Sequence, residues 1–389
     1  MDPVVARSAL FLAVSSGCLY PQDFVLWTRP EVRLPAPIVD GNSPGVWIDG
    51  QLRVYTSTGA QPMAMTGATV FQLGMTADPV VSPRDHYPLW IEAAWRDDDG
   101  RIFAWYHHEP SGVCGSSALT APRIGALVSD DGGRTFRDLG IVLASGDPLD
   151  CAAQNGFFAG GHGDFSVIPD TSRQYFYFLF TNYGGAADAQ GVSLARMAFE
   201  DRANPAGKVW KLHADRWESA GVGGPVTPVF PATIPWNRPN AESFWGPSVH
   251  WNSYLLRYVV VMNRACCAAN WQQEGIWLTS NHDLNNPFTW QTPQKLLDDS
   301  EIGFAPGYYP QLWGSSLGET DSAAGQAVRL YVKGVSSWEI LFTGGAEAPP
   351  PAPSRDPVPG IDPRLENPSA SFPAPPPPPR RRRPPFPQP

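Results

Sequence analysis

Four carboxylic acids stand near the starts of short β-type segments that are far apart in the sequence. They are Asp40, Glu92, Asp164 and Glu242, and a fifth such start carries Gln311. Only 17% of the residues are charged, so four acids at five equivalent starts exceed what chance supplies. Cleavage of a glycosidic bond needs two carboxyl groups, one protonated and one ionised, and a third often tunes the donor. The pattern predicts this chemistry if the fold brings the starts together.

Aromatic and imidazole side chains accompany these acids. Aromatic residues reach 12% of the chain, with 15 Trp, and flat aromatic faces match the apolar faces of sugar rings. We therefore assign substrate binding to Glu92, Gln311 and a further set near the strand starts or ends: Trp90, His107, His162, Trp245 and His250. The alternative for each aromatic or histidine is a place in the β core or in the channel.

The elements that must position these residues recur in sets. Long aromatic segments such as "YFYFLFTNY" are each followed by a segment that opens near a glycine, as in "GVSLAR", and preceded by one such as "GDFSVIPD". Five such units predict an all-β chain, a five-bladed β-propeller with four strands per blade, rather than a two-domain β-sandwich. The first strand of each blade lines the channel, so the five starts would converge on one pocket.

Two turn motifs support the propeller. "SDDGGRTF", residues 129–136, fits the Asp-box hairpin of sialidases and related propellers, and "SNHDLNNPFTW", residues 280–290, resembles a looser copy. The Asp131 side chain is expected to cap the turn, which is a structural role. The Asp-box leaves a sialidase as a third functional hypothesis, which would need Arg123, Arg196 and Arg264 to converge on a substrate carboxylate.

The layout over residues 36–343 resembles the five-bladed propeller glycosidases, above all glycoside hydrolase family 43 and the related β-fructosidases. The resemblance is greatest in "DFSVIPD", residues 164–170, which keeps two aspartates six residues apart. It implies that Asp40 acts as the base, that Asp164 assists, and that Glu242 is the acid. A base at Asp40 implies inversion at the sugar carbon, whereas a nucleophile at Asp40, as in the β-fructosidases, implies retention.

Two departures from this resemblance leave two functions open. Asp40 and Glu242 each lie three residues upstream of the positions where the family has its catalytic acids, and Ser43 and Trp245 occupy those positions. Either both opening loops are longer and the acids still reach the pocket, or the propeller binds carbohydrate without turnover. The expected ligand is an oligo- or polysaccharide of plant or microbial origin in both cases.

Composition divides the chain into three parts. Residues 1–35 form an N-terminal segment with a short apolar stretch that resembles a degenerate signal or a lipoprotein signal ending at Cys18. Residues 36–344 form the propeller, and residues 345–389 are dominated by proline and end in an arginine block, which predicts a disordered tail. Export to the periplasm or medium and a cytoplasmic location both remain open.

The remaining composition narrows the partners. A net charge of −9 argues against a nucleic-acid partner, and no stretch approaches the roughly 20 apolar residues of a membrane span. We expect a monomer. No His, Cys and Asp cluster has metal-ligand spacing, so no cofactor is predicted, although some related propellers carry axial calcium. Cys114 and Cys151 are able to pair if the protein is exported, and the sequence leaves that pairing open, whereas the adjacent Cys266 and Cys267 are poor candidates for pairing with each other.

Overall fold

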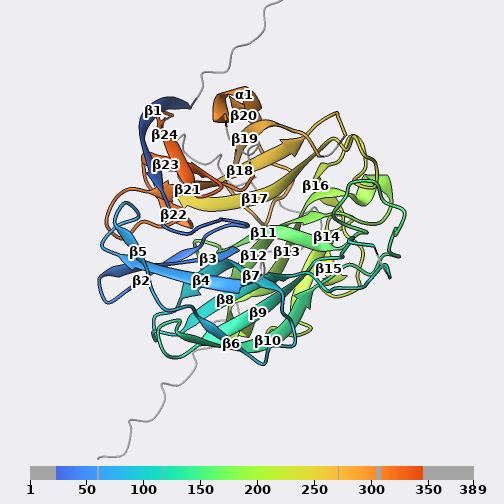
Figure 1. Ribbon diagram of the computed structural model, residues 1–389, viewed down its shortest axis with the longest axis horizontal. Helices are drawn as coiled ribbons and strands as arrows, with labels where there is room; N and C mark the ends of the chain where they lie inside the picture. Colours follow the sequence, from blue (N-terminus) through green and yellow to red (C-terminus); the bar gives the residue numbers. More distant parts are fainter. Residues whose placement is uncertain (1–22, 59–60, 116, 270, 304–307, 345–389) are drawn as a thin grey trace, which may run out of the picture. The chain divides into compact units, whose positions relative to one another are not determined.

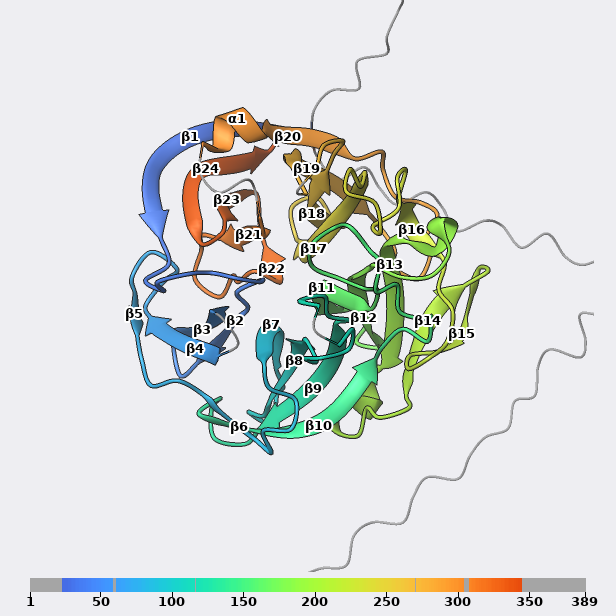
Figure 2. The ribbon, with the colours of Figure 1, turned by 45° about the vertical axis from the view of Figure 1, so that its right-hand side comes forward.

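The computed structural model describes residues 23–58, 61–115, 117–269, 271–303 and 308–344, all of which belong to the compact unit Met1–Glu347. The proposed signal with Cys18 and the proline-rich tail lie outside these ranges. Within them, five mainly antiparallel sheets are arranged in a ring, as Figures 1 and 2 show. The predicted five-bladed β-propeller is therefore confirmed.

Each blade runs from an inner strand at the ring centre to outer strands, and blades one to three follow in chain order. Blade one contains β2 (Gly45–Ile48), β3 (Gln51–Thr58), β4 (Gln61–Gly67) and β5 (Leu73–Met75). Blade two contains β7 (Leu89–Arg96), β8 (Ile102–His108), β9 (Arg123–Ser129), β10 (Thr135–Leu143) and β6 (Val80–Ser82). Blade three contains β11 (His162–Pro169), β12 (Tyr175–Asn182), β13 (Gly191–Ala198), β14 (Val209–His213), β15 (Arg216–Ala220) and β16 (Pro228–Pro231).

The last two blades complete the ring. Blade four contains β17 (Ser243–Asn252), β18 (Arg257–Ala265), β19 (Gln273–Asn281), β20 (Gln294–Asp298) and the parallel addition β22 (Ala323–Ala324). Blade five contains β21 (Pro310–Gly314), β23 (Ala327–Val332), β24 (Val335–Phe342) and β1 (Phe24–Arg33). The short helical turns are η1 (Ala187–Ala189), η2 (Phe199–Ala203) and α1 (Asp299–Ile302). None of the helices in the described ranges has the length and hydropathy needed to cross a membrane.

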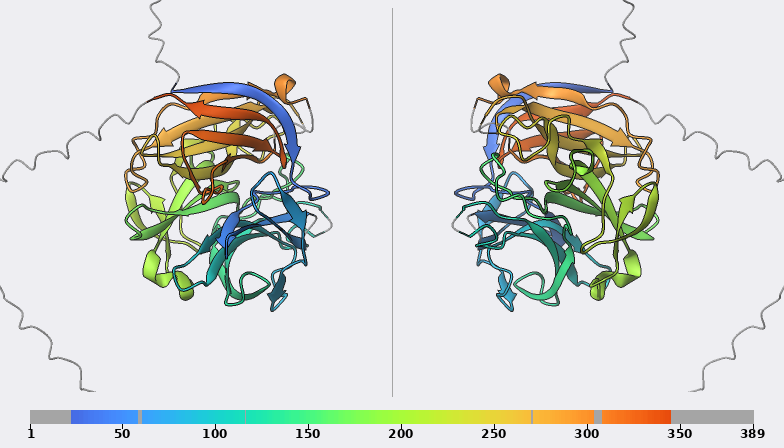
Figure 3. Two further views of the ribbon diagram at one scale, coloured as in Figure 1. Left: turned by 90° about the vertical axis from the view of Figure 1, so that its left-hand side faces the viewer. Right: turned by 90° about the vertical axis from the view of Figure 1, so that its right-hand side faces the viewer.

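The first described strand closes the ring. β1 pairs antiparallel with β24, so that Phe24 lies opposite Phe342, and Figure 3 shows it along the outside of blade five. The propeller thus begins upstream of residue 36, where the sequence pattern placed its boundary. That pattern missed β1 because this outermost strand is largely exposed and lacks the long apolar run of an interior strand.

Hydrophobic clusters lie between neighbouring sheets. Phe103 of blade two packs in one cluster with Phe176 of blade three, and Tyr177 of blade three packs in another with Val260 of blade four. Because each sheet is covered on both faces, its middle strands are nearly continuous apolar runs, and every described residue of "IFAWYHH" is buried. These interfaces hold the inner strands at fixed positions around the axis.

The Asp-box prediction is also confirmed. The Asp131 carboxylate accepts hydrogen bonds from the Thr135 and Arg134 amides at 2.9 and 3.0 Å, and Phe136 is buried in the blade. In the looser copy at residues 280–290, Asn281 takes this place and accepts from the Thr289 hydroxyl at 2.8 Å. Both motifs stabilise hairpins.

Candidate functional site

A pocket opens where the inner strands begin, and two kinds of side chain line it. The first group, here called the acid wall, comes from blades two and three and consists of Glu92, His107, Glu109 and Asp164. The second group, here called the aromatic wall, comes from blade four and the segment leading to blade five and consists of Trp245, Trp271, Tyr308 and Tyr309. Asp40 from blade one, Trp90, Phe157 and Phe158 complete the lining, and the pocket volume is about 210 Å³.

Irregularities in two inner strands direct residues towards this pocket. The register of β7 with β8 shifts between Ile91 and Ala93, which places Glu92 at a β-bulge. The register of β11 shifts between Gly163 and Phe165, and the intervening Asp164 has a φ of 43°. An extra residue in one strand re-aims side chains, and a non-glycine residue at positive φ is uncommon and is held in place by its surroundings. The folded ring therefore imposes the orientations of both acids.

The short segment Asp40 to Ser43 fixes blade one against the other four blades. The Trp90 indole of blade two donates to Asp40 Oδ2 at 3.3 Å, and the Asn42 amide donates to the carbonyl oxygens of Phe165 and Pro247, in blades three and four, at 2.8 and 3.2 Å. The Ser43 amide donates to Gln311 Oε1 of blade five at 3.0 Å. The longer opening loop therefore holds Asp40 at the pocket while its next residues fill the axis beneath.

Gly41 matters within this segment because of its close approach to Glu92. A Cβ added there would lie 3.0 Å from Glu92 Oε1, and the glycine has a φ of +136°. Only a residue without a side chain lets the backbone lie against this carboxylate without strain. The glycine of "DGNS" therefore leaves room for the Glu92 carboxylate of blade two, which lies against it.

Hydrogen bonds link the members of the acid wall. His107 lies between the other groups: its Nε2 is 3.1 Å from Glu109 Oε1, and its Nδ1 is 3.5 Å from Glu92 Oε1. The Asp164 amide donates to His107 Nδ1 at 3.2 Å, and the Phe165 amide donates to Glu92 Oε2 at 2.9 Å. His107 therefore carries its proton on Nε2 in this arrangement and donates to Glu109.

Two tyrosines hold Asp164 from the other side. The Tyr183 hydroxyl donates to Asp164 Oδ2, and the Tyr309 hydroxyl donates to Oδ1 at 3.3 Å. Burial and the charge of Asp164 raise the pKa of both tyrosines well above the usual range, so they stay protonated as donors. Asp164 thus has a partner on each carboxylate oxygen.

Burial changes the protonation of the pocket acids. It raises the pKa of Asp40, against the opposing charge of Lys333, and it raises the pKa of Glu92. Burial also raises the pKa of Asp164 to about 7. The charge of Glu92 adds to this increase, whereas the charge of His107 opposes it. Burial alone would lower the pKa of His107, but the bonds to Glu109 and Glu92 raise it above its usual value. Such perturbed groups in one pocket mark a functional site.

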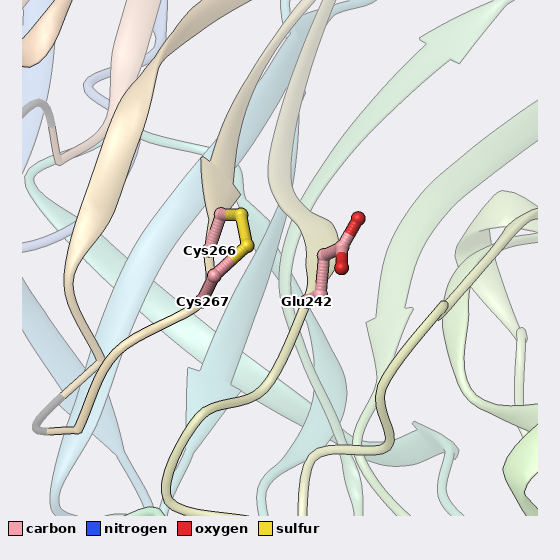
Figure 4. Close-up of side chains that lie close together, drawn as sticks. All are labelled: Glu242, Cys266 and Cys267. Atoms are coloured by element: carbon pink, nitrogen blue, oxygen red, sulfur yellow. A yellow bond between two sulfur atoms is a disulfide. The ribbon is translucent and has the colours of Figure 1, made fainter.

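Two groups of residues have donor atoms close enough to be tested as metal ligands. Glu92, His107 and Asp164 have donor atoms within 4.8 Å of one another, but the His107 Nδ1 lone pair already accepts the Asp164 amide. Glu242, Cys266 and Cys267 are also close, but the two sulfurs are joined in a disulfide (Figure 4). Neither group, as folded, presents free ligands to an ion.

Several predicted site residues do line the pocket. They are Asp40, Trp90, Glu92, His107, Asp164 and Trp245. Of the two residues at the positions of the family's catalytic acids, Trp245 lines the pocket and Ser43 does not. Ser43 is buried and bound to Gln311 and Thr56 instead.

Glu242 is the main correction. It is not among the residues that line the pocket, and its Oε1 lies 2.5 Å from Arg264, which also binds Glu274 at 2.6 Å. The longer opening loop of blade four pairs with Ile234, as the Glu242 amide donates to the Ile234 carbonyl oxygen at 3.0 Å, and this turns the side chain towards β18. Figure 4 shows Glu242 beside the Cys266–Cys267 disulfide.

Three substrate-binding predictions are also corrected. His162 is buried in blade three, where its Nε2 lies 3.1 Å from the Lys211 amine. His250 is buried next to Asn252, and burial lowers its pKa to about 3, so it is a neutral core histidine. Gln311 uses both ends of its amide on the Ser43 backbone. None of the three is among the residues that line the pocket.

The cysteine and arginine predictions have separate outcomes. Cys114 and Cys151 form a disulfide, a pairing that the sequence left open. The adjacent Cys266 and Cys267 also pair, although the sequence made them poor candidates. Among the described residues that line the pocket there is no arginine. Arg196 bonds instead to Asn285 on the surface, so the arginine cluster of a sialidase is not formed.

Sequence reasoning missed several lining residues. They are Glu109, Phe157, Phe158, Trp271, Tyr308 and Tyr309. All lie in connections between strands, where no periodic pattern indicates the direction of a side chain. The one available signal was "HHE" at the end of β8, which places an acid two residues beyond His107.

Comparisons with known proteins agree with the fold. No protein family matches the sequence, and no curated protein matches it. A thermostable family-43 glycoside hydrolase of known structure is similar at a TM-score of 0.50 with 10% identity, covering 85% of this chain and 100% of that one. An endo-arabinase from Bacteroides thetaiotaomicron has a TM-score of 0.48 and 10% identity, covering 81% and 97%. An exo-β-1,3-galactanase from Phanerochaete chrysosporium has 0.45 and 12%, covering 82% and 62%. At such identities, the first of these likenesses shows the five-bladed fold.

Proposed function

We propose that this protein is a glycoside hydrolase that cleaves a sugar unit held in the pocket between the acid wall and the aromatic wall. The observation that carries the proposal is the gathering of four carboxyl groups, those of Asp40, Glu92, Glu109 and Asp164, in one aromatic pocket. Burying so much acid costs free energy that folding alone does not require. Glycosidic cleavage is the reaction that uses paired carboxyl groups in this way.

The role of each pocket carboxyl group follows from its surroundings. Asp40 is one working carboxyl, because it lines the pocket and is only partly buried. Asp164, the residue that the family-43 resemblance would make an assistant, is held by Tyr183 and Tyr309 and tunes the pocket field. The aromatic wall offers flat faces for sugar stacking. Because Glu242 lies outside the pocket, the proton donor is instead one of the carboxyl groups that line the pocket. Two pocket carboxyls then suffice for an inverting reaction.

A carbohydrate-binding propeller without turnover is the second candidate. Trp245 favours it, since this tryptophan stands where the resemblance puts the family acid and lines the pocket. The Arg264 pair further removes Glu242 from any acid role. Binding without cleavage would then use the same aromatic faces.

Hydrolysis of arabinan, xylan, fructan and galactan, followed by reducing-sugar release, tests the proposal. Tryptophan fluorescence measures binding of the same polysaccharides in parallel. We expect cleavage of at least one by the parent protein, with Asp40→Asn losing it and Glu242→Gln keeping it. Binding of a polysaccharide with no cleavage by the parent would contradict the enzyme and support the binding protein.

A further inference from the structure

The pocket still needs a second working carboxyl opposite Asp40, and its members differ in how available their oxygens are. Glu92 is 2% exposed; its Oε2 is bonded to the Phe165 amide, and its Oε1 faces His107 and the Gly41 backbone. Asp164 is 3% exposed, and a tyrosine hydroxyl bonds to each of its oxygens. Both carboxyls are thus almost fully enclosed by protein atoms, which leaves little room for a substrate or a water.

Glu109 differs from both. Its side chain is 29% exposed, it lines the pocket, and only Oε1 is bonded, to His107 Nε2 at 3.1 Å. The second oxygen, Oε2, accepts no hydrogen bond within the described residues. Glu109 therefore presents an open carboxylate oxygen to the pocket while its other oxygen is anchored.

The anchor also fixes which nitrogen of His107 faces Glu109, since Nε2 lies 3.1 Å from Glu109 Oε1. His107 Nε2 carries a hydrogen in the tautomer that accepts the Asp164 amide, and it would carry one in the imidazolium as well, so it donates to Glu109 in both forms. A donated hydrogen bond stabilises an ionised carboxylate. Asp40 is more enclosed, and the charge of Glu109 acts on it, so the two carboxyls are neighbours with unlike surroundings.

We infer that Glu109 is the catalytic base of the pocket, working opposite Asp40 as the proton donor, with His107 as the residue that positions Glu109. This inference rests on the proposed glycosidase function and reverses the part that the family resemblance gave to Asp40. Burial raises the pKa of Asp40, which is the direction that the donor role requires.

The reaction balances with these two groups alone. The Asp40 proton passes to the glycosidic oxygen as the bond from that oxygen to the sugar carbon breaks. A water oxygen bonds to the same carbon from the opposite face, and Glu109 takes one of the water's protons. The products are the free sugar and an alcohol, and proton exchange with solvent restores both carboxyls.

Kinetics of three variants on aryl glycosides of the sugar that the parent cleaves test this assignment. Glu109→Gln retains an acceptor for His107 but cannot take a proton, so kcat should fall by about 10²–10⁴-fold for every leaving group. Azide needs no proton removed, so it should restore Glu109→Ala by at least about tenfold and give a glycosyl azide. Asp40→Asn should lose most activity with a poor leaving group and far less with 2,4-dinitrophenol, which leaves without protonation. Glu274→Gln, outside the pocket, is the matched control.

The outcomes separate the two proposals. Two results would overturn the base role of Glu109 without affecting the proposed hydrolase function. One is a parent-like rate in Glu109→Gln. The other is a loss of activity that azide does not restore and that depends on the leaving group. No glycoside cleavage by the parent would overturn the function and this assignment together. Thermal unfolding of each variant shows whether the fold is retained, and His107→Gln, which also donates a hydrogen bond, should retain more activity than His107→Ala.

Discussion

The acid wall and the aromatic wall line one pocket, and the glutamates Glu92 and Glu242, which come from the blades of these walls, have different surroundings. On the acid wall, Glu92 is 2% exposed and is held by backbone and His107 inside a cluster of carboxyl groups. On the side of the aromatic wall, Glu242 leaves the pocket to tryptophan and is neutralised by Arg264. The charged chemistry is therefore gathered on blades one to three, and blade four supplies surface for contact.

The largest expected contrast is in catalysis. Asp40→Asn should lower kcat/KM by about 10²–10⁴-fold, because a group that transfers a proton contributes about that much. Glu242→Gln should change it by less than about threefold, since this residue does not line the pocket. Rates with the best polysaccharide of the hydrolysis screen measure both. Equal losses would show that the acid of blade four still acts, and the comparison of the two walls would fail.

A second contrast concerns stability. Glu92→Ala should lower the free energy of unfolding by about 3–5 kcal/mol, because it leaves the Phe165 amide and His107 without their buried partner. Glu242→Ala should cost about 1 kcal/mol or less, because its ion pair with Arg264 remains partly exposed. Urea unfolding at pH 7 measures both values. A larger cost for Glu242 would mean that the Arg264 cluster, and not the acid wall, holds the pocket together.

The third prediction concerns pH and follows from Asp164. Burial raises its folded-state pKa to about 7 from 3.8, so the folded state binds more protons than the unfolded chain between these values. The stability contributed by the protonated form is complete below pH 3.8 and is lost as the pH rises through about 7. Asp164→Asn should therefore flatten the fall of the melting temperature between pH 4 and 7.5. A constant difference between parent and variant across this range would refute the raised pKa.

The smallest expected effect lies on the aromatic rim. Phe157 is 47% exposed, lines the pocket and packs against Trp271 with ring centroids 4.8 Å apart. Phe157→Ala should raise KM by about 3–10-fold and leave kcat within about twofold, because a stacking surface binds ground and transition states alike. Steady-state kinetics check this separation. A fall in kcat without a change in KM would move Phe157 into the chemistry of the acid wall.

Three of the four acids predicted at strand starts line the pocket, and the fourth does not. The repeated strand order predicts the five blades, and Asp40, Glu92 and Asp164 reach the pocket because first-strand starts must converge in a propeller. Glu242 does not, because the direction of a side chain in a longer loop depends on its cross-strand partner. Phe244 lies opposite Arg264 in the β17–β18 pair, so an arginine beside this loop was the available warning.

The residues that the sequence did not predict share one physical origin. Glu109 and Phe157 lie in connections, and Trp271 lies just before β19, so backbone alternation gives no rule for where they point. Their positions depend on packing between segments far apart in the chain, such as the contact of Phe157 with Trp271. Only the folded ring determines such contacts.

The segment Asp40 to Ser43 bonds to blades two, three, four and five at once. Its bonds are complete only when every blade is in place, so the pocket is intact only in a fully closed ring. Partial unfolding of any one blade should then release a bond of this segment and loosen Asp40 with it. Ligand affinity would consequently fall when any one of the five blades unfolds. A ligand bound in the pocket would in turn stabilise the closed ring, so that the five sheets unfold together in one cooperative transition.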